Sequence, residues 1–218
     1  MISHSIPFIV AAYFLGSIPF GKLIATVVAH ININQRGSGN IGATNVAREL
    51  GLKWGLFTLF FDILKGFVPV AIFAHYIAGM GEGSDVWLSA VGLSALLGHQ
   101  LSIFLKFRGG KGVATAVGVY LAMSYPACLL AVLVFVLTVY KWDFISLGSM
   151  LSAAAMPGFL ALFGKSQGIV IGSGIVAAFI CLKHTGNIQR LLKGNERKWR
   201  NRQNQASRSR RLSSSSSE

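Results

Sequence analysis

Charged residues and cysteines are scarce in this sequence, which argues against a soluble globular domain and against a disulfide scaffold. Only 12% of the 218 residues are charged, whereas 53% are hydrophobic, and the mean hydropathy is +0.58. This profile places the chain in a lipid bilayer. The two cysteines, Cys128 and Cys181, fall inside apolar runs and lack the spacing of a disulfide or a metal site. We therefore expect reduced packing residues and no metal.

Basic residues are abundant, with twenty Lys and Arg against seven Asp and Glu and a net charge of +13. Such an excess suggests nucleic-acid binding, yet ten of the twenty lie from Lys183 onward, beyond the last apolar run. The charge therefore marks membrane topology, and we expect no nucleic-acid partner. Residues 201–218 are rich in Arg and Ser, cannot bury apolar area and are predicted to be a disordered cytoplasmic tail. Such a tail can bind RNA, but attraction to anionic lipid headgroups is the simpler interpretation.

Long apolar runs alternate with short polar loops, which predicts an all-α, polytopic membrane helix bundle over residues 1–200. A helix needs about 20 apolar residues to cross the hydrocarbon core. No basic segment of a signal peptide precedes the first run, so we expect it in the mature protein. The fourth and fifth runs are only about 14 residues long, and five spans are the alternative to seven. The predicted spans are residues 6–29, 54–78, 86–105, 112–124, 126–140, 146–163 and 168–183.

Basic residues follow the first, third, fifth and seventh runs, whereas the alternate loops are acidic, neutral or carry Lys165 alone. Basic loops stay in the cytoplasm, so the N-terminus is predicted outside and the C-terminus inside. The glycine-rich loops then all face the cytoplasm. The basic residues of the first three inside loops are Arg36, Arg48, Lys53, Lys106, Arg108, Lys111 and Lys141.

The first inside loop reads RGSGNIGATNVAR and combines glycines with hydrogen-bonding side chains. Its G-x-G-x-x-G spacing does not indicate a dinucleotide site, because a membrane helix precedes it where a strand is required. Glycines let backbone N–H groups approach an anion, and an arginine adds a bidentate fork. We predict a phosphate site, with a tight glycine turn as the alternative. The residues assigned to it are Ser38, Gly39, Asn40, Gly42, Thr44, Asn45 and Arg48.

The second inside loop places Lys111 among Gly109, Gly110 and Gly112 at the start of the next helix. It is not a Walker loop, which requires a further glycine and a Ser or Thr that this chain lacks. A point charge beside free N–H groups is again an anion site, so these four residues are assigned to phosphate binding. His99, in the same loop, is interpreted as a hydrogen-bonded structural residue rather than a ligand or base.

A third polar cluster follows the last run and contains His184, Asn187, Arg190 and Glu196. On a helix starting near Asn187, Arg190 falls on the same side. A basic helix cap is the alternative, although it explains only the basic residues of the cluster.

Polar residues inside or next to the apolar runs are further candidates. Ser146 and Ser149 open the sixth run on the same inside face, where an N-cap and a packing serine are their ordinary roles. Asp62 and Lys65 lie within the second run, three residues apart, and are able to form an ion pair. Ionisable residues at membrane depth are functional candidates by default.

Three motifs stand in order on the three inside loops: GSGNIGATN, FRGGKGVAT and HxxNIxRLLxGxE. Together they resemble the PlsY-type acyl-phosphate:glycerol-3-phosphate acyltransferases of bacteria, over residues 6–200. The resemblance implies transfer of a fatty acyl group from acyl phosphate to the 1-hydroxyl of glycerol 3-phosphate, giving lysophosphatidic acid and phosphate. It implies the first acylation of phospholipid synthesis, in a multi-pass protein of the bacterial inner membrane whose active site faces the cytoplasm.

The resemblance also carries roles to individual residues. It implies substrate binding or catalysis for Ser38, Arg48, Lys111, Ser149, His184, Asn187 and Glu196. We assign catalysis to five of them. The five are Ser38, Arg48, Lys111, His184 and Asn187. The residues assigned to substrate binding are Gly39, Asn40, Gly42, Thr44, Asn45, Gly109, Gly110, Gly112, Ser146, Ser149, Arg190 and Glu196.

Acyl phosphate is already activated, so no acyl-enzyme, cofactor or metal is required. The enzyme must place the acceptor hydroxyl, stabilise the oxyanion and ease departure of phosphate. Arg48 and Lys111 are expected to neutralise phosphate charge. The hydroxyl proton passes to His184 or to a substrate phosphate. We favour the substrate, because no carboxylate stands beside His184 in the sequence.

Two other functions fit part of the sequence. A transporter of an anionic phosphorylated metabolite would also use membrane glycines and basic residues, but it needs polar groups on both sides of the membrane. An acyltransferase that uses acyl-CoA or acyl carrier protein usually carries a His-x-x-x-x-Asp pair. In this chain Phe104 and Gln189 stand five residues after His99 and His184. The sequence therefore favours acyl phosphate as the donor.

Overall fold

The computed structural model describes residues 2–78 and 84–200, and every regular element in these two ranges is helical. The predicted all-α fold is confirmed, while the predicted tail, residues 201–218, lies outside the described residues. Two 3₁₀ turns, η1 (Ile33–Gln35) and η2 (Ile103–Leu105), lie in loops. The α-helices are α1 (Ile2–Ser17), α2 (Phe20–Ala29), α3 (Ala43–Leu50), α4 (Leu52–Tyr76), α5 (Ser84–Gln100), α6 (Val113–Met123), α7 (Tyr125–Trp142), α8 (Ile145–Leu162), α9 (Gln167–Lys183) and α10 (Thr185–Leu192).

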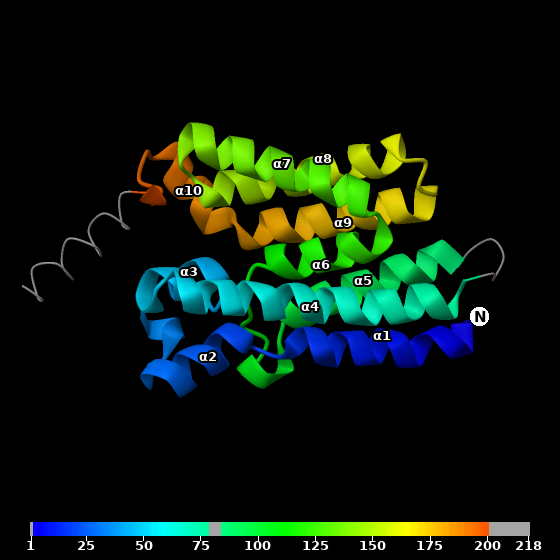
Figure 1. The fold of residues 1–218 in the computed structure, drawn as a ribbon, viewed down its shortest axis with the longest axis horizontal. Coiled ribbons are helices and arrows are strands. Elements are labelled where there is room, and N and C mark those ends of the chain that lie inside the picture. Colours follow the sequence, from blue (N-terminus) through cyan, green and yellow to red (C-terminus); the bar gives the residue numbers. More distant parts are fainter. Residues whose placement is uncertain (1, 79–83, 201–218) are drawn as a thin grey trace, which may run out of the picture.

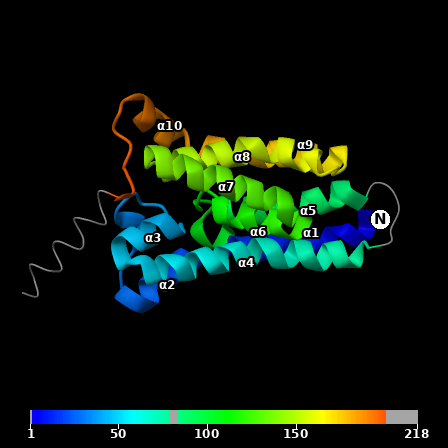
Figure 2. The same ribbon diagram turned by 45° about the horizontal axis from the view of Figure 1, so that its top comes forward.

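The long helices lie side by side along the longest axis of the molecule (Figure 1). Helix α4 packs against α1, α5 and α6, and α8 packs against both α7 and α9. Helix α9 also contacts α5, which joins the N-terminal and C-terminal halves of the bundle. The turned view shows α5 and α6 between the α1–α4 layer and the layer of α8 and α9 (Figure 2).

All seven predicted spans fall on helices, but not all are long enough to cross a bilayer. Five candidate spans are long and apolar enough: residues 4–29, α4, residues 84–105, α7 and α8. The pair α9 and α10, bent by 61°, makes a sixth candidate if it is counted as one span. Helix α6 has 11 residues, roughly 17 Å of helix, which is too short to cross the hydrocarbon core alone.

Helices α4 and α6 approach closely because glycines stand at their contact. A Cβ added at Gly66 would overlap the carbonyl of Thr115, and one added at Gly118 would overlap the carbonyl of Ile63. Small residues are the usual means of close packing in membranes, where lipid tails are as apolar as the side chains. This contact brings the start of α6, and with it Lys111, next to α4.

A small apolar cluster lies beneath the first glycine loop. It consists of Ala25, Ile33, Ile41 and Val46, each at most 2% exposed. These residues come from α2, η1, the loop and α3. Their packing fixes α3 and the preceding loop relative to α2.

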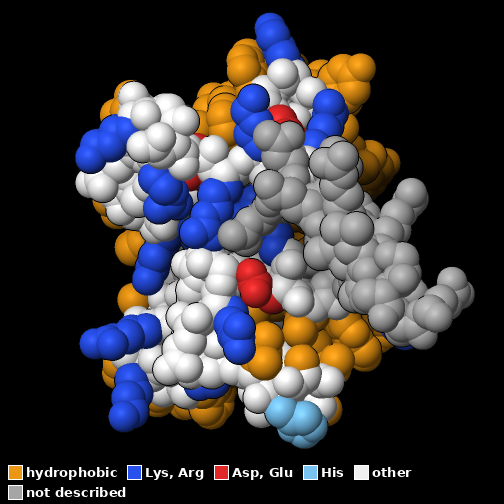
Figure 3. All heavy atoms as spheres, turned by 90° about the vertical axis from the view of Figure 1, so that its left-hand side faces the viewer, with side chains coloured by type: hydrophobic (Ala, Val, Ile, Leu, Met, Phe, Trp, Pro, Cys, Tyr) orange, Lys and Arg blue, Asp and Glu red, His pale blue; other side chains and the backbone are white. Residues whose placement is uncertain are grey.

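Helices α2, α3 and α10 and the turn between α7 and α8 lie at one end of the bundle (Figure 1). Figure 3 looks onto this end and shows many Lys and Arg side chains around its centre. Basic side chains at this end agree with the charge pattern from which the topology was predicted. The orientation of the termini stays a prediction.

Candidate active site

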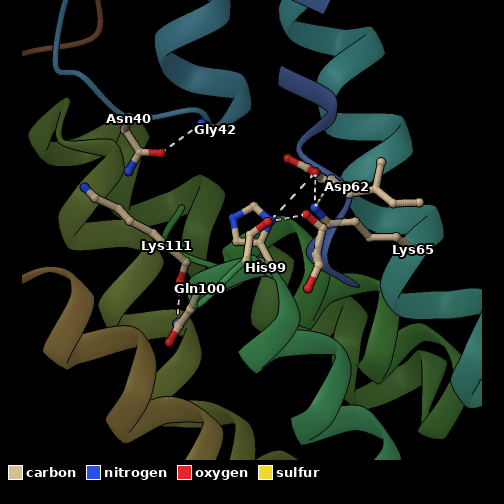
Figure 4. Close-up of polar contacts among 10 residues, drawn as sticks. Asn40, Gly42, Asp62, Lys65, His99, Gln100 and Lys111 are labelled. Carbon is tan, nitrogen blue, oxygen red and sulfur yellow. Dashed lines mark hydrogen bonds and ion pairs between the residues drawn. The ribbon is translucent and has the colours of Figure 1, made fainter. Parts of the chain in front are cut away.

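The first glycine loop is folded around the side chain of Asn45, which is 2% exposed and belongs to the first turn of α3. Its Oδ1 accepts a hydrogen bond from the backbone N–H of Ser38 at 2.9 Å. Its Nδ2 donates to the carbonyls of Arg36 and Asn40 at 3.1 and 2.9 Å. The N–H of Gly42 donates to Asn40 Oδ1 at 2.8 Å (Figure 4). Asn45 therefore shapes the loop with its amide.

Gly37 is required for this arrangement. Its φ is +58°, in the left-handed region that favours glycine. A Cβ there would overlap Asn45 Oδ1 and lie 2.5 Å from Glu49 Oε1. Gly39, with φ +72°, turns the chain next. It is not among the residues that line the cavity described below, and its contact with substrate stays a prediction.

The second glycine loop is attached to the end of α5. The N–H of Gly109 donates to the carbonyl of Gln100 at 3.2 Å, and the N–H of Gly110 donates to that of His99 at 3.0 Å. A Cβ at either glycine would overlap atoms of His99. The two glycines pack closely against the end of α5 and are not among the residues that line the cavity described below, and the phosphate contact predicted for them stays a prediction. Gly112, with φ +84°, precedes α6 and does line the cavity.

The third cluster joins the second loop through a chain of polar contacts. The ammonium of Lys111 donates to Asn187 Oδ1, and Asn187 Nδ2 donates to Glu196 Oε1 at 2.6 Å. Ser146 Oγ donates to the same carboxylate oxygen at 2.7 Å. Arg190 Nε donates to Glu196 Oε2 at 2.8 Å. The loop before α6, the start of α8 and α10 are therefore held together around one carboxylate.

A single cavity of about 700 Å³ connects these three clusters. Its polar end contains most of the predicted site residues, and its walls continue between α4, α6, α7, α8 and α9 as apolar side chains. Leu59, Val117, Phe135 and Met156 are examples from four of these helices. The predicted residues that line it are Ser38, Asn40, Gly42, Thr44, Asn45, Arg48, Lys111, Gly112, Ser146, Ser149, His184, Asn187, Arg190 and Glu196.

Several lining residues were not assigned to the site from the sequence. Asp62 and His99 line the cavity from the membrane-spanning helices, and Lys183 and Arg197 add positive charge. The signal for Asp62 was its place inside an apolar run. The apolar walls gave no signal of their own, because each residue is ordinary within its helix.

His184 follows α9, is 2% exposed and lines the cavity. Its Nδ1 lies 2.8 Å from the carbonyl oxygen of Ile180. A carbonyl only accepts hydrogen bonds, so Nδ1 carries the proton, and in the neutral ring Nε2 holds the lone pair. Ser149 Oγ donates to its own helix at the carbonyl of Ile145, at 2.8 Å.

The cavity changes the ionisation of its charged groups outside the helices. Burial lowers the pKa of Lys111 to about 8, and the positive charges of Arg190 and Arg48 act in the same direction against the attraction of Glu196. Burial alone would raise the pKa of Glu196, but hydrogen bonds from Ser146, Asn187 and Arg190 lower it overall. At neutral pH both groups are charged.

A family model described as glycerol-3-phosphate acyltransferase matches residues 6–194. The chain is 46% identical to a glycerol-3-phosphate acyltransferase of Geotalea daltonii, over 89% of this chain and 97% of the relative. It is 45% identical to the protein of that name from Trichlorobacter lovleyi, over 88% and 96% of the two chains.

The fold is similar to crystal structures of PlsY (YgiH), an integral membrane glycerol 3-phosphate acyltransferase. The glycerol 3-phosphate form matches with a TM-score of 0.84 at 36% identity, over 89% of this chain and 95% of that one. The lysophosphatidic acid form matches with a TM-score of 0.83 at the same identity and coverage.

Proposed function

The chain belongs to the glycerol-3-phosphate acyltransferase family and is of the PlsY type, and we propose that its acyl donor is an acyl phosphate. The reaction transfers the fatty acyl group to the 1-hydroxyl of glycerol 3-phosphate and gives lysophosphatidic acid and inorganic phosphate. The transporter considered from the sequence is set aside, because the family is one of enzymes.

The observation that carries the proposal is the amphipathic cavity. Its polar end holds Arg48, Lys111 and Arg190, and its walls are apolar side chains of the membrane helices. An acyl phosphate has the same two-part chemistry, with a charged phosphate at one end of an apolar chain. Glycerol 3-phosphate brings a second phosphate, and several cations in one cavity fit two anionic substrates better than one.

The chemistry needs positioning and charge compensation more than covalent catalysis. The 1-hydroxyl oxygen attacks the acyl carbon, the bond from that carbon to the phosphate oxygen breaks, and phosphate leaves with the electron pair. Arg48 and Lys111 offset the charge on the phosphates as it shifts to the leaving group. Ser38 and the N–H groups near Gly112 orient the anions at the polar end of the cavity.

The hydroxyl proton passes to a phosphate oxygen in this proposal. Among the described residues His184 makes no ion pair with a carboxylate. Burial and the positive charge of Lys111 disfavour a charged imidazolium there and outweigh the opposite effect of Glu196. The lone pair on Nε2 of His184 suits the acceptance of a hydrogen bond from the substrate hydroxyl. His184 thus orients the nucleophile and the phosphate takes its proton.

The reaction takes place on the cytoplasmic side of the inner membrane in this proposal. Two features support it: the polar end of the cavity lies at the basic end of the bundle (Figure 3), and basic loops stay in the cytoplasm. Glycerol 3-phosphate enters there from water, while the acyl chain lies between the helices.

The proposal is tested by product analysis of the purified protein in detergent. Glycerol 3-phosphate is offered with acyl phosphate, acyl-CoA or acyl carrier protein in turn. Acyl phosphate alone should support formation of lysophosphatidic acid. An equal or faster rate with acyl-CoA would show that the donor is wrongly assigned.

A further inference from the structure

Asp62 and His99 line the cavity from α4 and α5, outside the groups assigned to the substrates. Both side chains are 3% exposed. Asp62 Oδ1 lies 2.8 Å from Lys65 Nζ and 3.8 Å from His99 Nδ1. Figure 4 shows Asp62 and Lys65 on one side of His99, with Gln100 and Lys111 on the other. Burying charged side chains at membrane depth costs free energy, so ionisable residues there are candidates for a functional role.

The Asp62–Lys65 ion pair lies on one side of the His99 ring. Lys65 Nζ also donates to the carbonyl of Ile18 at 2.8 Å, which ties the pair to the end of α1. Among residues 2–78 and 84–200, His99 Nδ1 has no hydrogen-bond partner. A carboxylate opposite this nitrogen favours the ring orientation in which Nδ1–H points toward Asp62. Asp62 therefore sets how the ring of His99 lies.

The other side of His99 contacts the second glycine loop. A Cβ at Gly110 would overlap His99 Nε2, and the N–H of Gly110 donates to the His99 carbonyl at 3.0 Å. The neighbouring Gln100 donates from Nε2 to the carbonyl of Lys111 at 2.8 Å. The loop is thus held on both sides of the peptide that joins Gly110 to Lys111.

We propose that His99 is a positioning residue for Lys111. Asp62, paired with Lys65, fixes the ring of His99, and the ring fixes the loop that carries the Lys111 ammonium to the substrate phosphates. His99 contacts no substrate in this role. The inference rests on the proposed function, because acyl transfer to glycerol 3-phosphate is the readout.

A double-mutant cycle between His99→Phe and Lys111→Ala tests the proposal. Phenylalanine keeps a ring beside Gly110 but has no nitrogen to face Asp62. His99→Phe alone should lower kcat/KM for glycerol 3-phosphate roughly five- to twentyfold, and less than about twofold when Lys111 is already alanine. The same loss in both backgrounds would show that His99 acts independently of Lys111 and would overturn the proposal.

The pH profile separates positioning from a general loss of folded protein. With the ring released, Lys111 becomes better hydrated, and the alkaline limb of kcat/KM should move to higher pH. A smaller folded fraction would lower the curve without moving that limb, and an unmoved limb would contradict the role. If His99→Phe does not fold, Asp62→Asn, which keeps the shape of the side chain, replaces it in the double-mutant cycle with Lys111→Ala.

Ser94→Ala is the matched control on α5. Ser94 is buried and donates to the carbonyl of Ile9 at 2.7 Å, outside the cavity lining. Ser94→Ala should change kcat/KM by the same factor with and without Lys111→Ala, and it should leave the alkaline limb at the same pH. Coupling of the same size as for His99 would overturn the proposal. A wild-type chain that forms no lysophosphatidic acid from acyl phosphate and glycerol 3-phosphate would instead contradict the proposed function.

Discussion

At the scale of single residues, Arg48 and Lys111 bring positive charge into the cavity from α3 and from the loop before α6. A charge-assisted hydrogen bond lost from a partly desolvated site costs about 1.5–3 kcal/mol, or roughly ten- to a hundredfold. Arg48→Ala and Lys111→Ala should therefore insert normally and lose at least about tenfold in kcat/KM. Steady-state assays with acyl phosphate and glycerol 3-phosphate measure the loss.

Two further variants distinguish phosphate binding by Arg48 and Lys111 from a role in membrane topology. Arg48→Lys should restore little activity, because an ammonium keeps the charge but not the bidentate geometry. Lys53→Ala is the control, since Lys53 is exposed, lies 5.2 Å from the ring centre of Trp54 and is outside the cavity lining. Equal, small losses at Arg48, Lys111 and Lys53 would mean that these residues set topology only.

The ionisation of Lys111 predicts a pH dependence. Burial lowers the pKa of Lys111 to about 8. The ammonium is present below that pH and is lost as the pH rises through it, so kcat/KM should fall above about pH 8. An arginine stays charged throughout the pH range in which the enzyme is assayed, so the alkaline limb of Lys111→Arg should move to higher pH even if its maximum rate is lower. A limb at the same pH in this variant would exclude Lys111 as its cause.

At the scale of elements, the loop between η1 and α3 depends on a backbone that only glycine adopts easily. Gly37→Ala places a side chain at positive φ, at a cost of about 1–2 kcal/mol, and against Asn45 and Glu49. The midpoint of thermal unfolding should fall by roughly 2–8 °C, and activity should fall with it. Gly158→Ala in α8 is the control, because no atom outside the neighbouring turns of its own helix lies within 4 Å of its Cβ position. Equal midpoints for both variants would contradict this explanation of the loop.

The helices show which structural features the length of an apolar run predicts and which it does not. Apolar run length located the helices, because a helical segment that crosses a bilayer must be mostly apolar whatever it packs against. Run length also indicated that the fourth run, residues 112–124, is short for a span, and α6 has only 11 residues. It did not indicate how so short a helix is held inside the bundle. That outcome depends on packing against α4, which the run alone does not contain.

The site shows a similar division. Lys111 and Asn187 were both predicted from their own loops, and the structure joins them directly. Asp62 and His99 are 37 residues apart in the sequence and meet only because α4 and α5 pack together. Gly110 was assigned to phosphate binding because it lies in a glycine-rich loop beside Lys111. The structure shows that the His99 ring lies where a Cβ at this position would be, which explains the glycine. Local motifs therefore identify the residues, and tertiary contacts decide their roles.

At the scale of the whole molecule, the charge asymmetry predicts one orientation in the membrane. In a background without Cys128 and Cys181, single cysteines replace the exposed residues Ser166 and Asn195, at opposite ends of α9 and α10. A membrane-impermeant thiol reagent added to intact spheroplasts should label position 166 and spare position 195 until the cells are opened. The reverse pattern would place the active site outside.

The most direct measurement is the stoichiometry of phosphate and lysophosphatidic acid in a rapid-mixing experiment. Pure protein is mixed with acyl phosphate, with or without glycerol 3-phosphate, and both products are counted. Direct transfer in one cavity predicts one phosphate per lysophosphatidic acid, and almost no phosphate when the acceptor is absent. A burst of phosphate equal to the amount of enzyme without acceptor, with the acyl group left on the protein, would contradict direct transfer.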